Sequence, residues 1–238
     1  RYIHLTETNI DKVFLEIGDK IHRTLMDNDI VVISRQPILH KGGVMGFRLK
    51  IIENGGNVLR IHPSVTGPFN ADFDGDEMQF AVPQTFKSKQ DVLKNMMINA
   101  CVRGDQYSSP WVGTIQNATL ASDIISLDST YLTQELFDQM LSFAKTFFES
   151  NNPGGIFRTD IQEFKKTLQS YRYPIDPLSG KAAFSFFLPK NFNYVRKKAD
   201  NKVHVVDGIL ISGELSKADV GKSSKGMVDG IIEMYGAE

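Results

Sequence analysis

Four acidic side chains and no basic one lie within residues 70–80, which read NADFDGDEMQF. Asp72, Asp74 and Asp76 place three carboxylates within five residues, and such groups repel one another unless a cation lies among them. Close oxygen ligands select Mg²⁺ or Ca²⁺. The pattern therefore indicates a divalent-cation site. Because Asp and Gly are also ordinary turn residues, a solvated turn is the alternative interpretation.

The spacing of these acids constrains the backbone. On an extended strand, Asp72 and Asp76 would lie about 13 Å apart at roughly 3.3 Å per residue, too far for one ion with ligands at about 2.1 Å. On a helix, side chains two positions apart point to different sides. We therefore expect a curled loop, in which Gly75 supplies the conformational freedom.

A calcium loop of the EF-hand kind also begins with ligands at alternate positions. It needs Gly at position six and Glu at position twelve, where this chain has Glu77 and Pro83. The metal interpretation that remains is catalytic Mg²⁺ in phosphoryl or nucleotidyl transfer.

The net charge of the chain gives no global sign of a nucleic-acid partner. The 238 residues carry a formal net charge of -1, so any such binding must be local. Residues 31–62 hold five Lys or Arg against one acid, which places a basic segment beside the acidic loop. A solvated sheet face is the alternative interpretation of this segment.

Hydropathy and cysteine content restrict the protein class. No apolar run approaches the roughly 20 residues of a membrane span. The single Cys101 excludes an internal disulfide and fits a reducing intracellular compartment. Since the chain lacks an initiating Met and opens in strand-like sequence, we expect that it was cut from something larger.

The first third of the chain predicts short strands separated by turns. Gly42-Gly43 and the Asn-Gly-Gly-Asn run at 54–57 can supply positive backbone angles, so we expect a hairpin over residues 44–61. The expected strands are 30–33, 44–52, 58–61 and 80–82.

Later segments mix helical and strand patterns. Ser88, Thr133 and Thr159 are expected near helix starts, and an Asn-Asn-Pro-Gly-Gly run at 151–155 is expected to end the second helix. Together the patterns predict an α+β fold that is mainly β. The expected helices are 88–100, 133–150, 159–171 and 223–235, and the expected strands are 182–188 and 203–211.

The run NADFDGDEM with its flanks resembles the active-site signature of the largest, beta-prime-like subunit of multisubunit DNA-directed RNA polymerases. Other runs follow in the family's order. They are MDND at 26–29 with RQPILHK at 35–41, VGTIQ at 112–116 and VGKSSKG at 220–226. The resemblance therefore spans essentially the whole chain.

The resemblance implies a fold and a division of the chain. In that family, the acidic loop projects from a double-psi β-barrel. Residues 1–116 would form the active-site region with this barrel, and residues 117–238 would form a mixed helix and strand pore region.

It also implies roles for five residues. Asp72, Asp74 and Asp76 would hold a persistent Mg²⁺ that lowers the pKa of the RNA 3′ hydroxyl and aligns it for attack on the α-phosphate. A second Mg²⁺ would arrive with the nucleotide. Arg35 matches an arginine near the ribose of the incoming nucleotide, and Asn70 matches an asparagine that reads the same sugar.

The implied activity is Mg²⁺-dependent nucleotidyl transfer, which adds ribonucleoside triphosphates to the RNA 3′ end on a DNA template. It requires the full multisubunit assembly. The implied partners are the second-largest and other polymerase subunits, the DNA template, the RNA–DNA hybrid and ribonucleoside triphosphates. A location inside the cell follows, in the nucleus or cytoplasm, or in a virion for a viral enzyme.

A non-catalytic metal-binding or assembly module that retains the barrel fold is the alternative. The intact acids together with Arg35 and Asn70 favour the enzyme. His40 and His62 are expected to be structural, since a lone histidine more often has that role.

Overall fold

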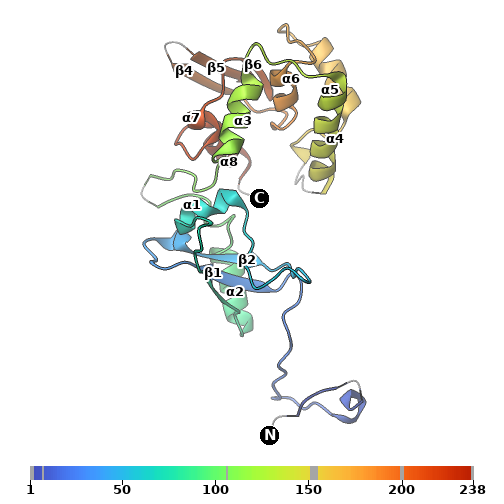
Figure 1. Ribbon diagram of the computed structural model, residues 1–238, viewed down its shortest axis with the longest axis vertical. Coiled ribbons are helices and arrows are strands. Elements are labelled where there is room, and N and C mark those ends of the chain that lie inside the picture. Colours follow the sequence, from blue (N-terminus) through green and yellow to red (C-terminus); the bar gives the residue numbers. More distant parts are fainter. Residues whose placement is uncertain (1–2, 7, 106, 151–154, 199–200, 237–238) are drawn as a thin grey trace.

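The computed structural model describes residues 3–6, 8–105, 107–150, 155–198 and 201–236. The described residues form two three-stranded antiparallel sheets, each accompanied by helices (Figure 1). The segment before the first strand extends away from the rest of the chain (Figure 1). The N-terminal half contains η1 Ile10–Lys12, β1 Ile30–Ser34, η2 Lys41–Gly43, β2 Val44–Arg48, η3 Pro63–Val65, α1 Thr66–Phe69, β3 Gln79–Ala81 and α2 Phe86–Asn95.

The first sheet has the strand order β2-β1-β3. Alternation along β1 buries Val31 and Ile33, which pack with Met45, Phe69 and Cys101 in one core cluster. The register pairs Ser34, the last residue of β1, with Gln79, the first residue of β3. The residue after β1 is therefore placed beside the end of the acidic loop.

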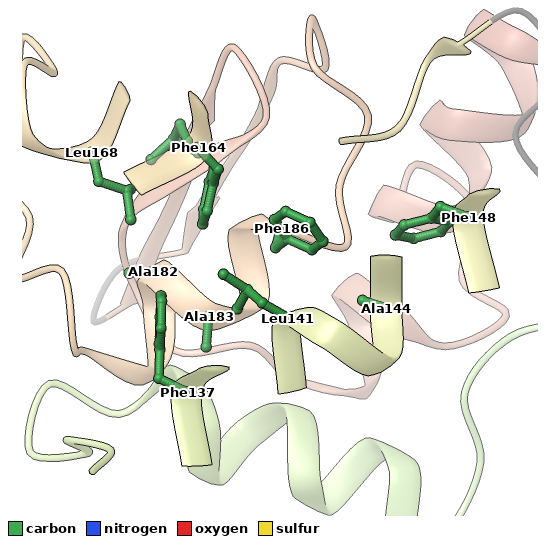
Figure 2. Close-up of a cluster of buried hydrophobic side chains, with 10 residues drawn as sticks. Phe137, Leu141, Ala144, Phe148, Phe164, Leu168, Ala182, Ala183 and Phe186 are labelled. Atoms are coloured by element: carbon green, nitrogen blue, oxygen red, sulfur yellow. The ribbon is translucent and has the colours of Figure 1, made fainter. Parts of the chain in front are cut away.

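The C-terminal half is built around a helical cluster and a second sheet. Its cores are formed by apolar faces of α4, α5 and α6 and by the sheet with α8. Figure 2 shows the helical cluster, in which Phe137 and Leu141 of α4 face Phe164 of α5 and Ala183 of α6. The elements are α3 Asn117–Ser126, α4 Gln134–Ser150, α5 Ile161–Gln169, α6 Gly180–Ser185, β4 Tyr194–Lys198, β5 Asn201–Val206, β6 Ile209–Ser212, α7 Lys217–Val220 and α8 Met227–Tyr235.

Contacts join the two halves. The backbone N–H and hydroxyl of Thr114 both donate to the Val220 carbonyl, at 3.0 and 2.9 Å. Arg103 pairs with Asp229 of α8 at 2.9 Å. The run around Thr114 is therefore held against the run that begins at Val220.

Several expected elements are present. The strands at 30–33 and 80–82 correspond to β1 and β3, and the helices expected to start near residues 133 and 159 are α4 and α5. Residues 151–154, which hold most of the expected stop of α4, lie outside the described residues. The helix expected at 88–100 begins earlier, because Thr85 and Ser88 form a capping box that starts α2 at Phe86.

The hairpin expected over residues 44–61 is wrong. β2 pairs with β1, so the hairpin has Gly42-Gly43 at its connection. The turn at Asn54 does form, with φ 58, but residues 57–62 do not enter a ladder. Val58 and Leu59 are exposed, so burial provides no force that would fix a register there.

The strand expected at 182–188 is also wrong, since residues 180–185 form α6. Ser179 caps this helix by accepting the Ala182 N–H, and Ala182 and Ala183 are completely buried. A short run of apolar residues in a core shows no alternation with polar residues, so its sequence does not distinguish a helix from a strand. The expected strand at 203–211 is instead the hairpin β5–β6, turned at Asp207-Gly208, where both residues have positive φ.

The α+β class is confirmed, but strands do not dominate the described residues. The described residues form six short strands and several helices, which include the 17-residue α4. The two sheets are separate, so the double-psi β-barrel stays a prediction.

A buried arginine connects two parts of the C-terminal half through hydrogen bonds. Arg158 is 8% exposed, and Nη1 donates to the carbonyls of Ser185, Leu188 and Gly208 at 3.1, 3.0 and 3.3 Å. Nη2 donates to the Asp207 carbonyl at 2.7 Å. Burial lowers the pKa of Arg158 to about 10, so the side chain is still charged at neutral pH. One cation thereby satisfies carbonyls from the end of α6 and from the β5–β6 turn.

We predict that Arg158→Met lowers the free energy of unfolding by about 3 kcal/mol or more, because several buried carbonyls lose their donor. Arg172→Met, at an exposed arginine, should change it by less than about 0.5 kcal/mol. Urea denaturation of both variants measures the difference. Equal stability of the two would contradict the role assigned to Arg158.

Candidate metal centre

The acidic loop connects α1 to β3. Asn70 ends α1 in the left-handed conformation, with φ 49, and its N–H donates to the Gly67 carbonyl. Residues 72–76 form neither helix nor strand. Gly75 has φ +119, a conformation that side chains rarely adopt, so glycine permits the curl at this position.

The three aspartates of the loop converge. One carboxylate oxygen from each of Asp72, Asp74 and Asp76 lies within 4.8 Å of the others. The Asp72 N–H donates to Oδ2 of Asp76 at 3.1 Å, which closes the loop through its own backbone. Asp72 and Asp74 are exposed and Asp76 is partly buried. The curled loop that the spacing predicts is therefore confirmed.

Arg35 forms a two-pronged ion pair with Asp76. Its Nε donates to Oδ2 at 2.7 Å and its Nη2 donates to Oδ1 at 3.0 Å, and both side chains are 20% exposed. Parallel bonds of this kind are the strong form of an arginine–carboxylate contact. The pairing of Ser34 with Gln79 places Arg35 there, although 41 positions separate it from Asp76.

The carboxylates of the loop differ in proton affinity. The hydrogen bond with Asp74, together with desolvation and repulsion from Asp74 and Asp76, raises the pKa of Asp72. The Arg35 hydrogen bonds and the Asp72 N–H lower the pKa of Asp76. The neighbouring acids therefore disfavour the charged form of Asp72, whereas Arg35 stabilises the charged form of Asp76.

The donor set fits a hard divalent cation. Three converging carboxylates offer the oxygen ligands that Mg²⁺ prefers, with room for the waters or phosphates that usually complete its shell. Asp72 and Asp76 also line a hollow of about 440 Å³ with Leu59, Ile61 and Met78. This arrangement could hold one Mg²⁺ at the edge of an open space.

The other predicted site residues are placed less directly. The Asn70 side chain is exposed two residues before Asp72, and among the described residues no hydrogen bond joins it to the triad. Glu77 lines the hollow but lies outside the converging set. His40 lies against Trp111, with ring centroids 4.5 Å apart, and His62 accepts the Ser64 N–H at 3.2 Å. The first is a packing contact and the second is a capping contact.

The basic segment at 31–62 is less free than its composition indicates. Arg35 pairs with Asp76, Lys41 with Asp105 and Lys50 with Asp27. Sequence reasoning missed these pairs, because each joins residues distant along the chain. It also missed the approach of Lys222 to α1, where a Cβ on Gly67 would lie 1.6 Å from Nζ.

Two protein-family models match the chain. A model described as RNA polymerase Rpb1, domain 2, matches residues 2–98, and one described as RNA polymerase Rpb1, domain 3, matches residues 102–238. Since the second match alone covers more than half of the chain, the chain belongs to the RNA polymerase Rpb1 family.

Named relatives are polymerase subunits. The chain is 27% identical over 271 residues to DNA-directed RNA polymerase subunit Rpo1N of Thermococcus celer. It is 29% identical over 231 residues to each of the DNA-directed RNA polymerase II subunits RPB1-B and RPB1-A of Trypanosoma brucei brucei. These alignments cover 100%, 95% and 95% of this chain. The chain spans only 28% of the first relative and 12% of each of the other two.

Among the helices of the described residues, none combines the length and apolar character that a membrane crossing requires.

We predict that carboxyl ¹³C NMR resolves the two shifted aspartates on opposite sides of the ordinary range. Asp72 should titrate above it and Asp76 below it, because the hydrogen bond with Asp74, desolvation and repulsion raise the pKa of Asp72, and Arg35 lowers the pKa of Asp76. As the pH falls, Asp72 therefore takes up a proton before Asp76. Protonation of Asp72 should therefore be the first step that weakens cation binding, because a protonated carboxyl is a poor ligand.

Arg35→Gln provides the control for this titration. It should raise the pKa of Asp76, whose largest shift comes from the Arg35 hydrogen bonds. An Asp76 titration that does not change in this variant would contradict the ion pair.

Proposed function

We propose that this chain is the catalytic segment of the largest subunit of a DNA-directed RNA polymerase. The observation that carries the proposal is the convergence of Asp72, Asp74 and Asp76 on one point in a loop beside Arg35. Membership of the Rpb1 family supports it, since the named relatives are DNA-directed RNA polymerase subunits. The reaction is addition of ribonucleoside triphosphates to the RNA 3′ end on a DNA template.

The three aspartates hold the catalytic metal in this proposal. When bound, Mg²⁺ supplies Lewis-acid activation of the attacking 3′ hydroxyl, and a second ion carried by the nucleotide neutralises the departing pyrophosphate. Asp72, Asp74 and Asp76 provide the oxygen ligands, and the Asp72 N–H keeps Asp76 turned toward the other two. Waters and substrate phosphates would supply the remaining ligands.

Arg35 and Asn70 recognise the ribose in this proposal. A guanidinium donates hydrogen bonds and a side-chain amide both donates and accepts, so the pair can read the hydroxyls that distinguish ribonucleotides from deoxyribonucleotides. Both residues lie near the triad, Arg35 through its ion pair with Asp76 and Asn70 through its position two residues before Asp72. Their roles in sugar recognition rest on the family resemblance.

We also propose that the two parts of the chain form two regions of the polymerase subunit. Residues 1–116 form the active-site region, in which β1, β2 and β3 belong to a double-psi β-barrel, and residues 117–238 form the pore region. The partners are the second-largest and other polymerase subunits, the DNA template and the RNA–DNA hybrid. The assembly acts inside the cell, in the nucleus or cytoplasm, or in a virion.

We predict that Asp74→Ala in the reconstituted polymerase abolishes RNA extension and leaves assembly nearly unchanged. One of three inner-shell ligands is lost, whereas an exposed loop acid contributes little to packing. Extension of a labelled RNA on a DNA template measures activity, and co-purification of the other subunits measures assembly. The isolated chain should give no extension, because it covers only 28% and 12% of the polymerase subunits it resembles.

Glu77→Gln is the matched control, since Glu77 lies next to the triad but outside the converging set. It should retain most of the extension activity. Undiminished extension by the Asp74→Ala assembly would contradict the catalytic assignment.

A further inference from the structure

Donors within the chain already engage both oxygens of the Asp76 carboxylate. Oδ2 accepts from Arg35 Nε at 2.7 Å and from the Asp72 N–H at 3.1 Å, and Oδ1 accepts from Arg35 Nη2 at 3.0 Å. A carboxylate offers about four lone-pair positions, so roughly one position remains, on Oδ1. A cation that binds there shares the Asp76 carboxylate with the guanidinium.

The two groups that contact Asp76 affect a cation differently. The Asp72 N–H is neutral and belongs to the loop, so it can stay when an ion binds. Arg35 carries a full positive charge, and because both side chains of the pair are only 20% exposed, water screens its repulsion of a divalent ion incompletely. The flexible arginine side chain can rotate away without moving the loop backbone.

We propose that Arg35 and a divalent cation compete for Asp76, so that cation binding requires Arg35 to leave this carboxylate. This inference rests on the proposed function of the loop as a Mg²⁺ site. The released guanidinium becomes available to the hydroxyls of a nucleotide sugar. Cation binding and sugar binding are then positively coupled, because each is favoured by the state in which Arg35 is away from Asp76.

If Arg35 only supported Asp76, its removal would change the cation affinity in the opposite direction. A support that holds Asp76 in position would strengthen cation binding, and its removal would weaken it. The loop has its own closing contact, the Asp72 N–H on Oδ2 of Asp76, so it does not depend on Arg35 for its curl. Removal of the arginine therefore distinguishes competition from support.

The test is titration of the 238-residue chain with Mn²⁺, followed by electron paramagnetic resonance of the free ion. Arg35→Lys keeps the charge but loses the two-pronged contact, and we expect about threefold tighter binding. Arg35→Gln also removes the charge, and we expect about tenfold tighter binding. Lys87→Gln removes an exposed charge from α2 and should stay within about twofold of wild type.

The outcomes separate the two proposals. If Asp74→Asn binds Mn²⁺ as tightly as wild type, the metal site itself is wrong. If Asp74→Asn loses binding but Arg35→Lys binds as wild type does, or more weakly, the metal site stands and the competition is overturned.

A second measurement observes the contact itself. The Arg35 Nε–H, assigned by comparison with Arg35→Lys, should exchange with water faster as Mg²⁺ is added, because its bond to Asp76 is lost. An exchange rate that does not change at saturating Mg²⁺ would overturn the competition.

Discussion

Repulsion among the carboxylates of Asp72, Asp74 and Asp76 is the constraint around which the N-terminal half is arranged. The three groups each place an oxygen within 4.8 Å of the others, which is unfavourable without positive charge nearby. Two contacts to Asp76 reduce this repulsion, one from the Asp72 N–H and one from the Arg35 guanidinium. A divalent cation would neutralise more charge than either contact, and this difference supports the proposed metal site.

The first sheet places Arg35 beside the acidic loop. Antiparallel pairing of β1 with β3 brings Arg35, which follows β1, beside the acidic loop, which precedes β3, and the buried side chains of Val31 and Ile33 fix that register. A shift by one residue would turn both of these side chains to the opposite face. The core of the sheet and the electrostatics of the loop therefore depend on the same alignment.

The C-terminal half contributes through its contacts with the first. Thr114 and Arg103 bind the segment from Val220 to Asp229, and Lys222 reaches the backbone of α1 close to the acidic loop. Arg158 in turn ties the end of α6 to the β5–β6 turn. Rigid packing in this half can thus support the position of α1, from which the acidic loop begins.

The sequence predicted the features that are encoded locally. The five-residue spacing of the acids implied a curled loop with Gly75 at the bend, and β1, α4 and α5 followed from periodicity, although Asp160 and not Thr159 caps α5. The ion pair of Arg35 with Asp76 depends on strand register across 41 positions, which no local pattern contains. The helix α6 was mistaken for a strand because its buried alanines leave no polar face, and the turn at residues 54–57 formed without the strand that was expected to follow it.

If Asp72, Asp74 and Asp76 hold one ion together, anomalous diffraction from crystals of the chain soaked in Mn²⁺ should show that ion. We expect one strong peak, at about 2.1 to 2.2 Å from one oxygen of each of the three aspartates. A peak bound to other acids, or none at the triad when the crystals hold saturating Mn²⁺, would contradict it.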